Sequence, residues 1–231
     1  MVCVALGSDF TLAVIDAGAV FSFGSSHCWA LGHGPIDRAV LLRRIEALAE
    51  SGRRFVAVAA GAHHALALNE EGQVYGWGCE SANGHGHHKR TPQRVTALAG
   101  ERVLLVYARG DSSCAVTEKG GLFTWGDANS YDYHLGHGVA GPTQRTPTRV
   151  EALSRVKVAA AAICDSHTLV ADDDGMVWGF GHDAALGLGK AGPPRVPNNA
   201  GANPGFGVDL PPGGFVVQPA PIPTLRVRTL P

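Results

Sequence analysis

A seven-residue pattern with two aromatic side chains two positions apart occurs four times along the chain, in Gly18–Gly24, Gly72–Gly78, Gly120–Gly126 and Gly175–Gly181. Because the side chains of a β-strand alternate between its two faces, both aromatics of each copy lie on one face and the residue between them on the other. The pattern therefore predicts four short strands, each with one wide apolar face. The aromatics that we expect to form the packing core between units are Phe21, Phe23, Tyr75, Trp77, Phe123, Trp125, Trp178 and Phe180.

Two further apolar stretches precede each aromatic strand. The first spans residues 2–7, 56–61, 103–110 and 158–164, and the second follows at once as Thr11–Val14, Ala65–Leu68, Cys114–Thr117 and Thr168–Ala171. A short acidic turn that ends in glycine then leads into the aromatic strand, and glycine supplies the positive φ that a tight hairpin requires. We therefore expect three antiparallel strands in succession in every unit.

A closing segment follows a glycine-rich loop in the first three units, as Arg44–Leu48, Arg94–Leu98 and Arg149–Leu153. Taken alone, residues 36–50 favour a helix, because leucine and isoleucine recur there at helical spacing. The equivalent segments carry Pro92 and Pro147 just before them, and the interior of a helix would not tolerate proline. We therefore expect a fourth strand at Arg44–Leu48.

The units repeat about every 50 residues, and four antiparallel strands per repeat of this length are typical of the blade of a β-propeller. A helical solenoid would require amphipathic 3.6-residue periodicity in every repeat, which the sequence lacks. We predict an all-β fold, a β-propeller of four-stranded antiparallel blades with about four blades, in a single domain over residues 1–231. Its units span about residues 1–54, 55–102, 103–155 and 156–225.

The fourth unit contains a long insertion, residues 190–219, that is rich in proline and glycine. Within it, Phe206–Leu210 and Phe215–Gln218 flank a Pro-Pro-Gly-Gly sequence, which favours a projecting hairpin. A disordered loop is an equally good interpretation of a segment this long. The segment Pro219–Leu225 that follows has the character of a closing strand.

The repeat resembles that of a known family. Residues 61–68 read Gly-Ala-His-His-Ala-Leu-Ala-Leu, residues 74–78 read Val-Tyr-Gly-Trp-Gly, and residues 31–34 and 135–138 read Leu-Gly-His-Gly. This succession resembles the regulator-of-chromosome-condensation repeat over nearly the whole chain except the insertion. The resemblance implies a seven-bladed propeller. It does not imply one function, since similar propellers serve as the nucleotide exchange factor for the small GTPase Ran, as targeting modules of ubiquitin ligases and ciliary proteins, and as a plant ultraviolet-B receptor.

The chain also departs from the family pattern. It contains four units where the family has seven, so we expect a partial or open propeller in preference to a closed ring of four blades. Cys164 replaces the usual glycine, and Phe10 and Ser113 replace the repeat histidine, which indicates a divergent member. The Gly-Trp-Arg-His-Thr motifs of the light receptor have no counterpart here, so light sensing is not expected.

Composition restricts the partners and the compartment. A formal net charge of −1 and a pI near 6.8 give no electrostatic reason to expect binding to nucleic acid or to an anionic membrane. The chain has neither an apolar run long enough to span a membrane nor a basic, signal-like start. Its five cysteines include no Cys-x-x-Cys pair, which favours reduced thiols over a disulfide framework or a zinc knuckle. We therefore expect a cytoplasmic or nuclear protein.

Metal binding is the first chemistry to weigh, because the chain has eleven histidines. Five of its histidines lie close together in the second unit, in His63–His64 and His85–His88. However, His33, His85 and His137 occupy one position of the repeat, as residues that hold turns together do. We expect no metal and no cofactor.

Catalytic motifs are weak. The sequence Asp165-Ser166-His167 lacks the strand-to-helix elbow that exposes a nucleophile. The acidic run Asp172–Gly175 lacks the alternating oxygen ligands of a calcium loop, and the chain contains no phosphate-binding Gly-x-x-x-x-Gly-Lys motif. We expect no catalytic residues.

Propellers usually bind partners through the loops at the ends of their blades, and two such loops are specific to this chain. The candidate partner-binding residues in them are Asp127, Asn129, Tyr131, Asp132, Tyr133 and His134, and Phe206, Asp209 and Phe215. We predict a non-enzymatic protein-interaction scaffold, with association through open propeller edges as a further expectation. The alternatives are a nucleotide exchange factor for a Ran-like small GTPase and a targeting module of a larger ubiquitin ligase.

Overall fold

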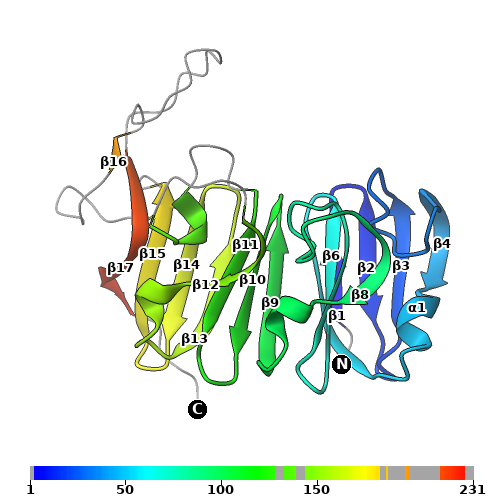
Figure 1. Cartoon of the computed structure of the whole chain (residues 1–231), viewed down its shortest axis with the longest axis horizontal. Helices are drawn as coiled ribbons and strands as arrows, with labels where there is room; N and C mark the ends of the chain where they lie inside the picture. The colour runs from blue at the N-terminus through cyan, green and yellow to red at the C-terminus, as the bar shows by residue number, and fades with distance from the viewer. Residues whose placement is uncertain are drawn as a thin grey trace.

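The computed structural model describes residues 3–127, 133–138, 144–182, 186, 196–197 and 214–226. They form four antiparallel sheets that follow one another in chain order, from blue to red in Figure 1. Each sheet is one blade of a partial β-propeller, as predicted. Within the described part of the chain, no helix has the length and apolar composition needed to cross a membrane.

The first three blades have the same order of elements. Blade 1 contains β1 (Cys3–Leu6), β2 (Phe10–Val14), β3 (Val20–Ser25) and β4 (Arg38–Arg44), followed by the short helix α1 (Glu46–Ala49). Blade 2 contains β5 (Phe55–Ala60), β6 (His64–Asn69), β7 (Val74–Gly78) and β8 (Lys89–Arg94), followed by the 3₁₀ turn η1 (Thr96–Leu98). Blade 3 contains β9 (Val103–Arg109), β10 (Ser112–Thr117), β11 (Leu122–Gly126), η2 (Tyr133–Leu135), β12 (Gln144–Arg149) and η3 (Glu151–Leu153).

Blade 4 differs in its closing strand. It contains β13 (Val158–Ile163), β14 (His167–Asp172), β15 (Met176–His182), β16 (Val196–Pro197) and the long strand β17 (Gly214–Arg226), which pairs with both β15 and β16. The predicted closing segment Pro219–Leu225 lies within β17. Most of the predicted insertion, including Phe206–Leu210, lies outside the described residues.

The closing strand of the first three blades was predicted in the wrong place. The strand ends at Arg44 in blade 1, and the segment predicted as strand, Arg44–Leu48, instead enters α1. Pro92 and Pro147 lie inside β8 and β12, not before a later strand. Each of these strands pairs on one side only, and an edge strand tolerates the missing N–H of proline. The short helical turn after it buries one leucine, Leu48 in blade 1.

The larger hydrophobic clusters lie between blades, and one smaller cluster lies within blade 4. Three clusters join blade 1 to blade 2, blade 2 to blade 3 and blade 3 to blade 4. β6 and β10 are buried along their whole length, whereas β2 alternates buried and half-buried positions because one face of blade 1 is exposed. The blades are therefore stabilised chiefly by packing against their neighbours.

The second aromatic of each repeat carries this packing. Trp77, Trp125 and Phe180 are fully buried, and the indole N–H groups of the two tryptophans donate to the main-chain oxygens of Ala30 and Ala82 in the preceding blade, at 2.7 Å each. The first aromatic of each pair, Phe21, Tyr75, Phe123 and Trp178, is half-buried.

Phe23 is an exception to the predicted core. It occupies the same repeat position as Trp77, but 37% of it is exposed. The expectation that all eight aromatics pack between blades is therefore wrong for this residue, because it lies on the exposed face of blade 1. The edge strand β4 of the same blade exposes Val40, Leu41 and Leu42 as well.

Candidate functional site: the loop end of blades 1 to 3

The blades present two different ends. One end, here called the loop end, contains the turns between first and second strands and the long loops between third and fourth strands. The other end, here called the hairpin end, contains the tight turns between second and third strands together with α1, η1 and η3. The loop end is the end at which sequence differs most between units, so it is where a specific site is expected.

A glycine at the end of each third strand holds the loop close to the neighbouring turn. Gly78 has a φ of +93°, and a Cβ at this position would lie 2.5 Å from the main-chain oxygen of His63. The amide of the next residue, Cys79, donates to that same oxygen at 2.8 Å. In blade 3 the amide of Asp127 makes the equivalent hydrogen bond to Asp111, at 2.9 Å. The first residue of each of these loops is thus fixed by the backbone.

Three histidines at the same position of the repeat, His33, His85 and His137, connect the long loops to the strands of their own blades. The Nε2 atoms of His33 and His137 lie 2.8 Å and 3.0 Å from the hydroxyls of Ser22 and Thr124. His85 Nε2 lies 3.2 Å from two main-chain oxygens of its own blade. Burial lowers the pKa of all three histidines, which favours the neutral ring. These contacts support the structural role inferred from the repeat.

Two other histidines tie the loop end to buried hydroxyls. His64 is fully buried, and its Nε2 lies 2.7 Å from Ser113 Oγ across the boundary between blades 2 and 3. Burial, with a smaller contribution from His63, lowers the pKa of His64 to about 3. His134 Nε2 lies 2.6 Å from Ser112 Oγ within blade 3, while the main-chain oxygen of His134 accepts a hydrogen bond from Thr168 of blade 4.

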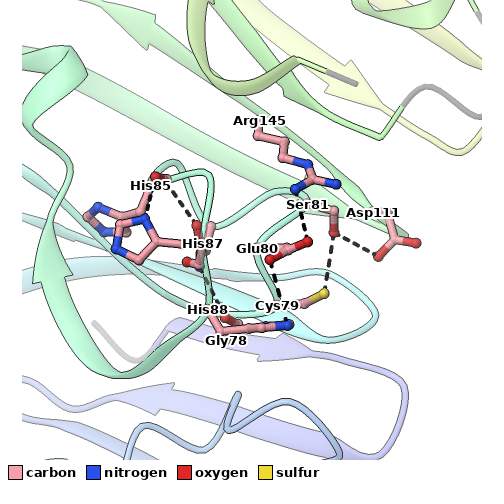
Figure 2. Close-up of polar contacts among 10 residues, drawn as sticks. Gly78, Cys79, Glu80, Ser81, His85, His87, His88, Asp111 and Arg145 are labelled. Carbon is pink, nitrogen blue, oxygen red and sulfur yellow. Dashed lines mark hydrogen bonds and ion pairs between the residues drawn. The ribbon is translucent and has the colours of Figure 1, made fainter. Parts of the chain in front are cut away.

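Side chains from blades 2 and 3 meet between these loops (Figure 2). Glu80 accepts from Arg145 of blade 3 at 2.9 Å, and its other oxygen lies 3.8 Å from His88 Nε2. Ser81 Oγ lies 3.6 Å from Cys79 Sγ and 3.5 Å from an oxygen of Asp111. Blade 2 is therefore joined to blade 3 by polar contacts above the apolar core.

Blade 1 contributes Cys28 and Trp29 to the same region. Trp29 has a φ of +59°, a left-handed conformation that is uncommon for a residue other than glycine. Its ring contacts the His88 ring edge-on, with centroids 5.7 Å apart, and the Arg90 guanidinium lies over it at 4.7 Å. Burial raises the pKa of Cys28 to about 11, with smaller contributions from Cys79 and then from Asp111 and Glu80.

We refer to Cys28, Cys79, Glu80, His88 and Arg145 as the inter-blade cluster. Sequence analysis did not identify it, because Cys28 and Cys79 belong to different units and no short motif joins them. Their separation of about one repeat is the only indication in the sequence, since residues one repeat apart lie in neighbouring blades.

The predicted partner-binding residues are only partly described. Asn129, Tyr131, Asp132, Phe206 and Asp209 lie outside the described residues, and of Tyr133 and Phe215 only the backbone is described, at the start of η2 and in β17. Asp127 is half-buried at the start of its loop. His134 is 1% exposed. Its side chain therefore belongs to the packing at the loop end and cannot form a contact surface, which corrects the prediction for this residue.

The weak catalytic motif of blade 4 does not assemble into a triad. His167 Nδ1 lies 3.0 Å from Cys164 Sγ and 3.4 Å from Ser166 Oγ. The exposed carboxylate of Asp165 lies 4.0 Å from Arg109 Nε of blade 3. Burial, and to a smaller extent His182, lowers the pKa of His167. The acidic residue thus contacts a neighbouring blade and does not orient the histidine.

Comparison with known proteins identifies the repeat. Residues 17–68 and 119–171 match the family model described as "Regulator of chromosome condensation (RCC1) repeat", and residues 55–86 match a second model of the same repeat. The chain belongs to the RCC1 repeat family. This agrees with the resemblance seen in the sequence and with the blades seen in the structure.

Curated relatives are identical to the chain at about a third of the aligned positions. The ultraviolet-B receptor UVR8 of Arabidopsis thaliana is 33% identical over 182 residues, which cover 77% of this chain and 40% of the receptor. The human E3 ubiquitin-protein ligase HERC2 is 34% identical over 212 residues, covering 88% of this chain and 4% of the ligase. The human RCC1-like G exchanging factor-like protein is 32% identical over 188 residues, covering 77% of this chain and 40% of that protein. The chain therefore spans less than half the length of these relatives.

Solved structures give the same fold. The crystal structure of human WBSCR16 matches with a TM-score of 0.73 and 25% identity, covering 95% of this chain and 51% of that one. Yeast RCC1 (Prp20), in its structure with Kap60, matches with a TM-score of 0.70 and 19% identity, covering 94% of this chain and 48% of that one. At this identity, the yeast protein supports the fold alone.

Proposed function

We propose that the chain is a non-enzymatic protein-interaction scaffold that binds its partners at the loop end. The observation that carries the proposal is the joining of the loops of blades 1 and 2 to each other and to β12 of blade 3, through Trp29 with His88 and through Glu80 with Arg145. Loops held in this way lose little conformational freedom on binding, and this lowers the entropic cost of forming a complex.

The composition of this surface suits protein recognition. Trp29 and Arg90 are stacked against each other, and tryptophan and arginine are the residue types most enriched among those that dominate binding energy. Trp29 is half-buried and Arg90 exposed, so the pair is accessible while its geometry is fixed. We propose this pair as a contact point for a protein partner, in addition to the candidate residues predicted from the sequence.

Membership of the family is consistent with this role. The match to HERC2 occupies 4% of that ligase, so similar repeats occur there as one part of a much larger protein. A targeting module is one form that the proposed scaffold can take. The relatives include a receptor, a ubiquitin ligase and an exchange-factor-like protein, so the family alone does not select a partner.

A matched pair of variants tests where partners bind. Lys89→Glu with Arg90→Glu reverses two adjacent charges at the loop end, and Arg53→Glu with Arg54→Glu does the same at the hairpin end. Arg53 and Arg54 form exposed ion pairs with Glu71 and Glu70, so their loss should affect stability little. We expect partners recovered by quantitative affinity purification to fall about tenfold for the loop-end variant only. An equal loss for both variants, or a loss at the hairpin end alone, would contradict the proposal.

The second candidate function is nucleotide exchange on a small GTPase. It is favoured by the similarity to the human RCC1-like G exchanging factor-like protein. An exchange factor accelerates release of bound nucleotide by stabilising the nucleotide-free GTPase. Stopped-flow release of a fluorescent guanine nucleotide from a panel of small GTPases tests it. Concentration-dependent acceleration would replace the scaffold proposal, and unchanged release at saturating protein would remove the exchange activity.

A further inference from the structure

Two thiols and one imidazole converge between blades 1 and 2 at the loop end. One donor atom from each of Cys28, Cys79 and His88 lies within 4.8 Å of the other two. Thiolate and imidazole are the usual ligands of zinc in proteins, with bonds of about 2.3 Å to sulfur and about 2.0 Å to nitrogen. Tetrahedral coordination places neighbouring donors about 3.5 to 3.8 Å apart, so adjustments of about 1 Å would bring the three side chains around one ion.

The backbone fixes the origin of each donor. Cys79 is held by the hydrogen bond from its amide to His63 and follows the positive-φ residue Gly78. His88 directly precedes β8, and its ring lies against Trp29, the residue after Cys28. Such support from neighbouring groups is what a metal site needs, because ligands must keep their positions when the ion is absent.

The two remaining members of the inter-blade cluster, Glu80 and Arg145, provide a second layer of contacts. Glu80 lies beside the His88 ring, and Arg145 holds its carboxylate in place (Figure 2). Metal-binding histidines commonly have a carboxylate beside the ring nitrogen that does not bind the metal, which orients the ring and increases its basicity. Glu80 faces Nε2 of His88, which leaves Nδ1 as the ligand atom. Three protein ligands leave the fourth tetrahedral position to water.

We propose that Cys28, Cys79 and His88 bind a zinc ion that links blade 1 to blade 2 at the loop end. Binding converts two thiols to thiolates and releases their two protons to solvent, while Zn²⁺ keeps its oxidation state. The two thiolates then balance the charge of the ion. The link has a structural consequence: it connects Trp29 in the loop of blade 1 to the strand that carries Arg90, and so fixes part of the proposed partner surface.

Cobalt(II) titration of the reduced, metal-free chain tests the proposal, with zinc as competitor. We expect one ion per chain, with the thiolate charge-transfer bands and the intense visible bands of a tetrahedral cobalt site, both abolished by zinc. Cys28→Ser and Cys79→Ser should each lower the zinc affinity by at least about 100-fold, whereas Glu80→Gln should lower it about 10-fold to 100-fold while retaining the thiolate bands.

Cys164→Ser is the matched control, because Cys164 is also half-buried at the loop end and also contacts a histidine, His167 at 3.0 Å. It should bind zinc as the wild type does. Circular dichroism of every variant shows whether the blades are intact, and zinc should raise the melting temperature of the wild type but not that of Cys28→Ser. Thiolate bands of wild-type intensity and cobalt affinity in Cys28→Ser or Cys79→Ser, their loss in Cys164→Ser, or a Cys28–Cys79 disulfide that survives reductant would each overturn the proposal.

Discussion

Trp77, Trp125 and Phe180 occupy one position of three successive repeats, and each is fully buried. Sequence comparison identified this position, because an aromatic recurs at it in every unit. It could not reveal that the same position in blade 1 is exposed, since burial there depends on a preceding blade and not on the residue itself. Phe23 therefore occupies the repeat position of a core residue but is exposed to solvent like a surface residue.

This difference gives a direct comparison of two truncations. Trp77→Ala removes a buried ring and its hydrogen bond to Ala30, and it should lower the free energy of unfolding by about 3 to 5 kcal/mol. Phe23→Ala removes a ring that is 37% exposed, and it should cost about 1 kcal/mol. Urea denaturation followed by circular dichroism measures both. Equal losses would show that packing between blades does not dominate stability.

The buried histidine His64 should make the fold sensitive to acid. Its folded pKa of about 3 lies below the value of about 6.5 in an unfolded chain. The unfolded state therefore takes up a proton between these values while the folded state does not, so stability is full above pH 6.5 and falls as the pH falls. Between pH 6.5 and pH 5 the loss should be about 2 kcal/mol from this residue.

Denaturant titrations at several pH values measure that loss. Burial also lowers the pKa values of four other histidines, His33, His85, His137 and His167. As the pH falls, the free energy of unfolding of the wild type should therefore decrease more steeply than His64 alone would cause. In His64→Gln, the free energy of unfolding should change less steeply with pH, by the amount that corresponds to the uptake of about one proton on unfolding. A slope that is the same in this variant and in the wild type would show that His64 titrates normally in the folded state.

At the scale of elements, the first three strands of each blade were predictable, whereas the fourth strand was predicted in the wrong place in the first three blades. The apolar alternation of the first three is repeated in every unit. The closing strand has a weaker pattern, as in Lys89–Arg94, and it contains proline. Proline was taken to exclude helix from the segment after it. It instead lies in an edge strand, and the following residues form a single helical turn that buries Leu98.

The turns that hold the loops can be tested with two glycines of equal φ. Gly78 and Gly100 both have a φ of +93°, but a Cβ at Gly78 would lie 2.5 Å from a main-chain oxygen, whereas Gly100 has nothing within 4 Å. Gly100→Ala should lower the free energy of unfolding by about 1 to 2 kcal/mol, which is the penalty for a side chain in a left-handed backbone conformation. Gly78→Ala should lower the free energy of unfolding by at least about 1 kcal/mol more, because the new Cβ would displace the backbone at His63. Thermal unfolding of the two variants compares them, and equal costs would contradict the close approach.

At the scale of the molecule, the sequence singled out the blade-end loops as the candidate site but did not show which residues assemble there. The repeat explains the aromatics and the turn histidines, and this directs attention to the loops between third and fourth strands. The contacts between Glu80 and Arg145, and between Trp29 and His88, join residues of different units with no local pattern. They could be found only once neighbouring blades were placed side by side.

The central claim is that partners bind at the loop end, and lysine cross-linking with mass spectrometry in cell extract tests it most directly. Lys89 lies at the loop end, at the start of β8, whereas Lys119 and Lys157 lie at the hairpin end, after β10 and before β13. We predict that cross-links to partner proteins are concentrated at Lys89. The account would be contradicted if cross-links to partners were concentrated at Lys119 and Lys157. In that case Lys89 would be modified by the reagent but not linked to any partner protein.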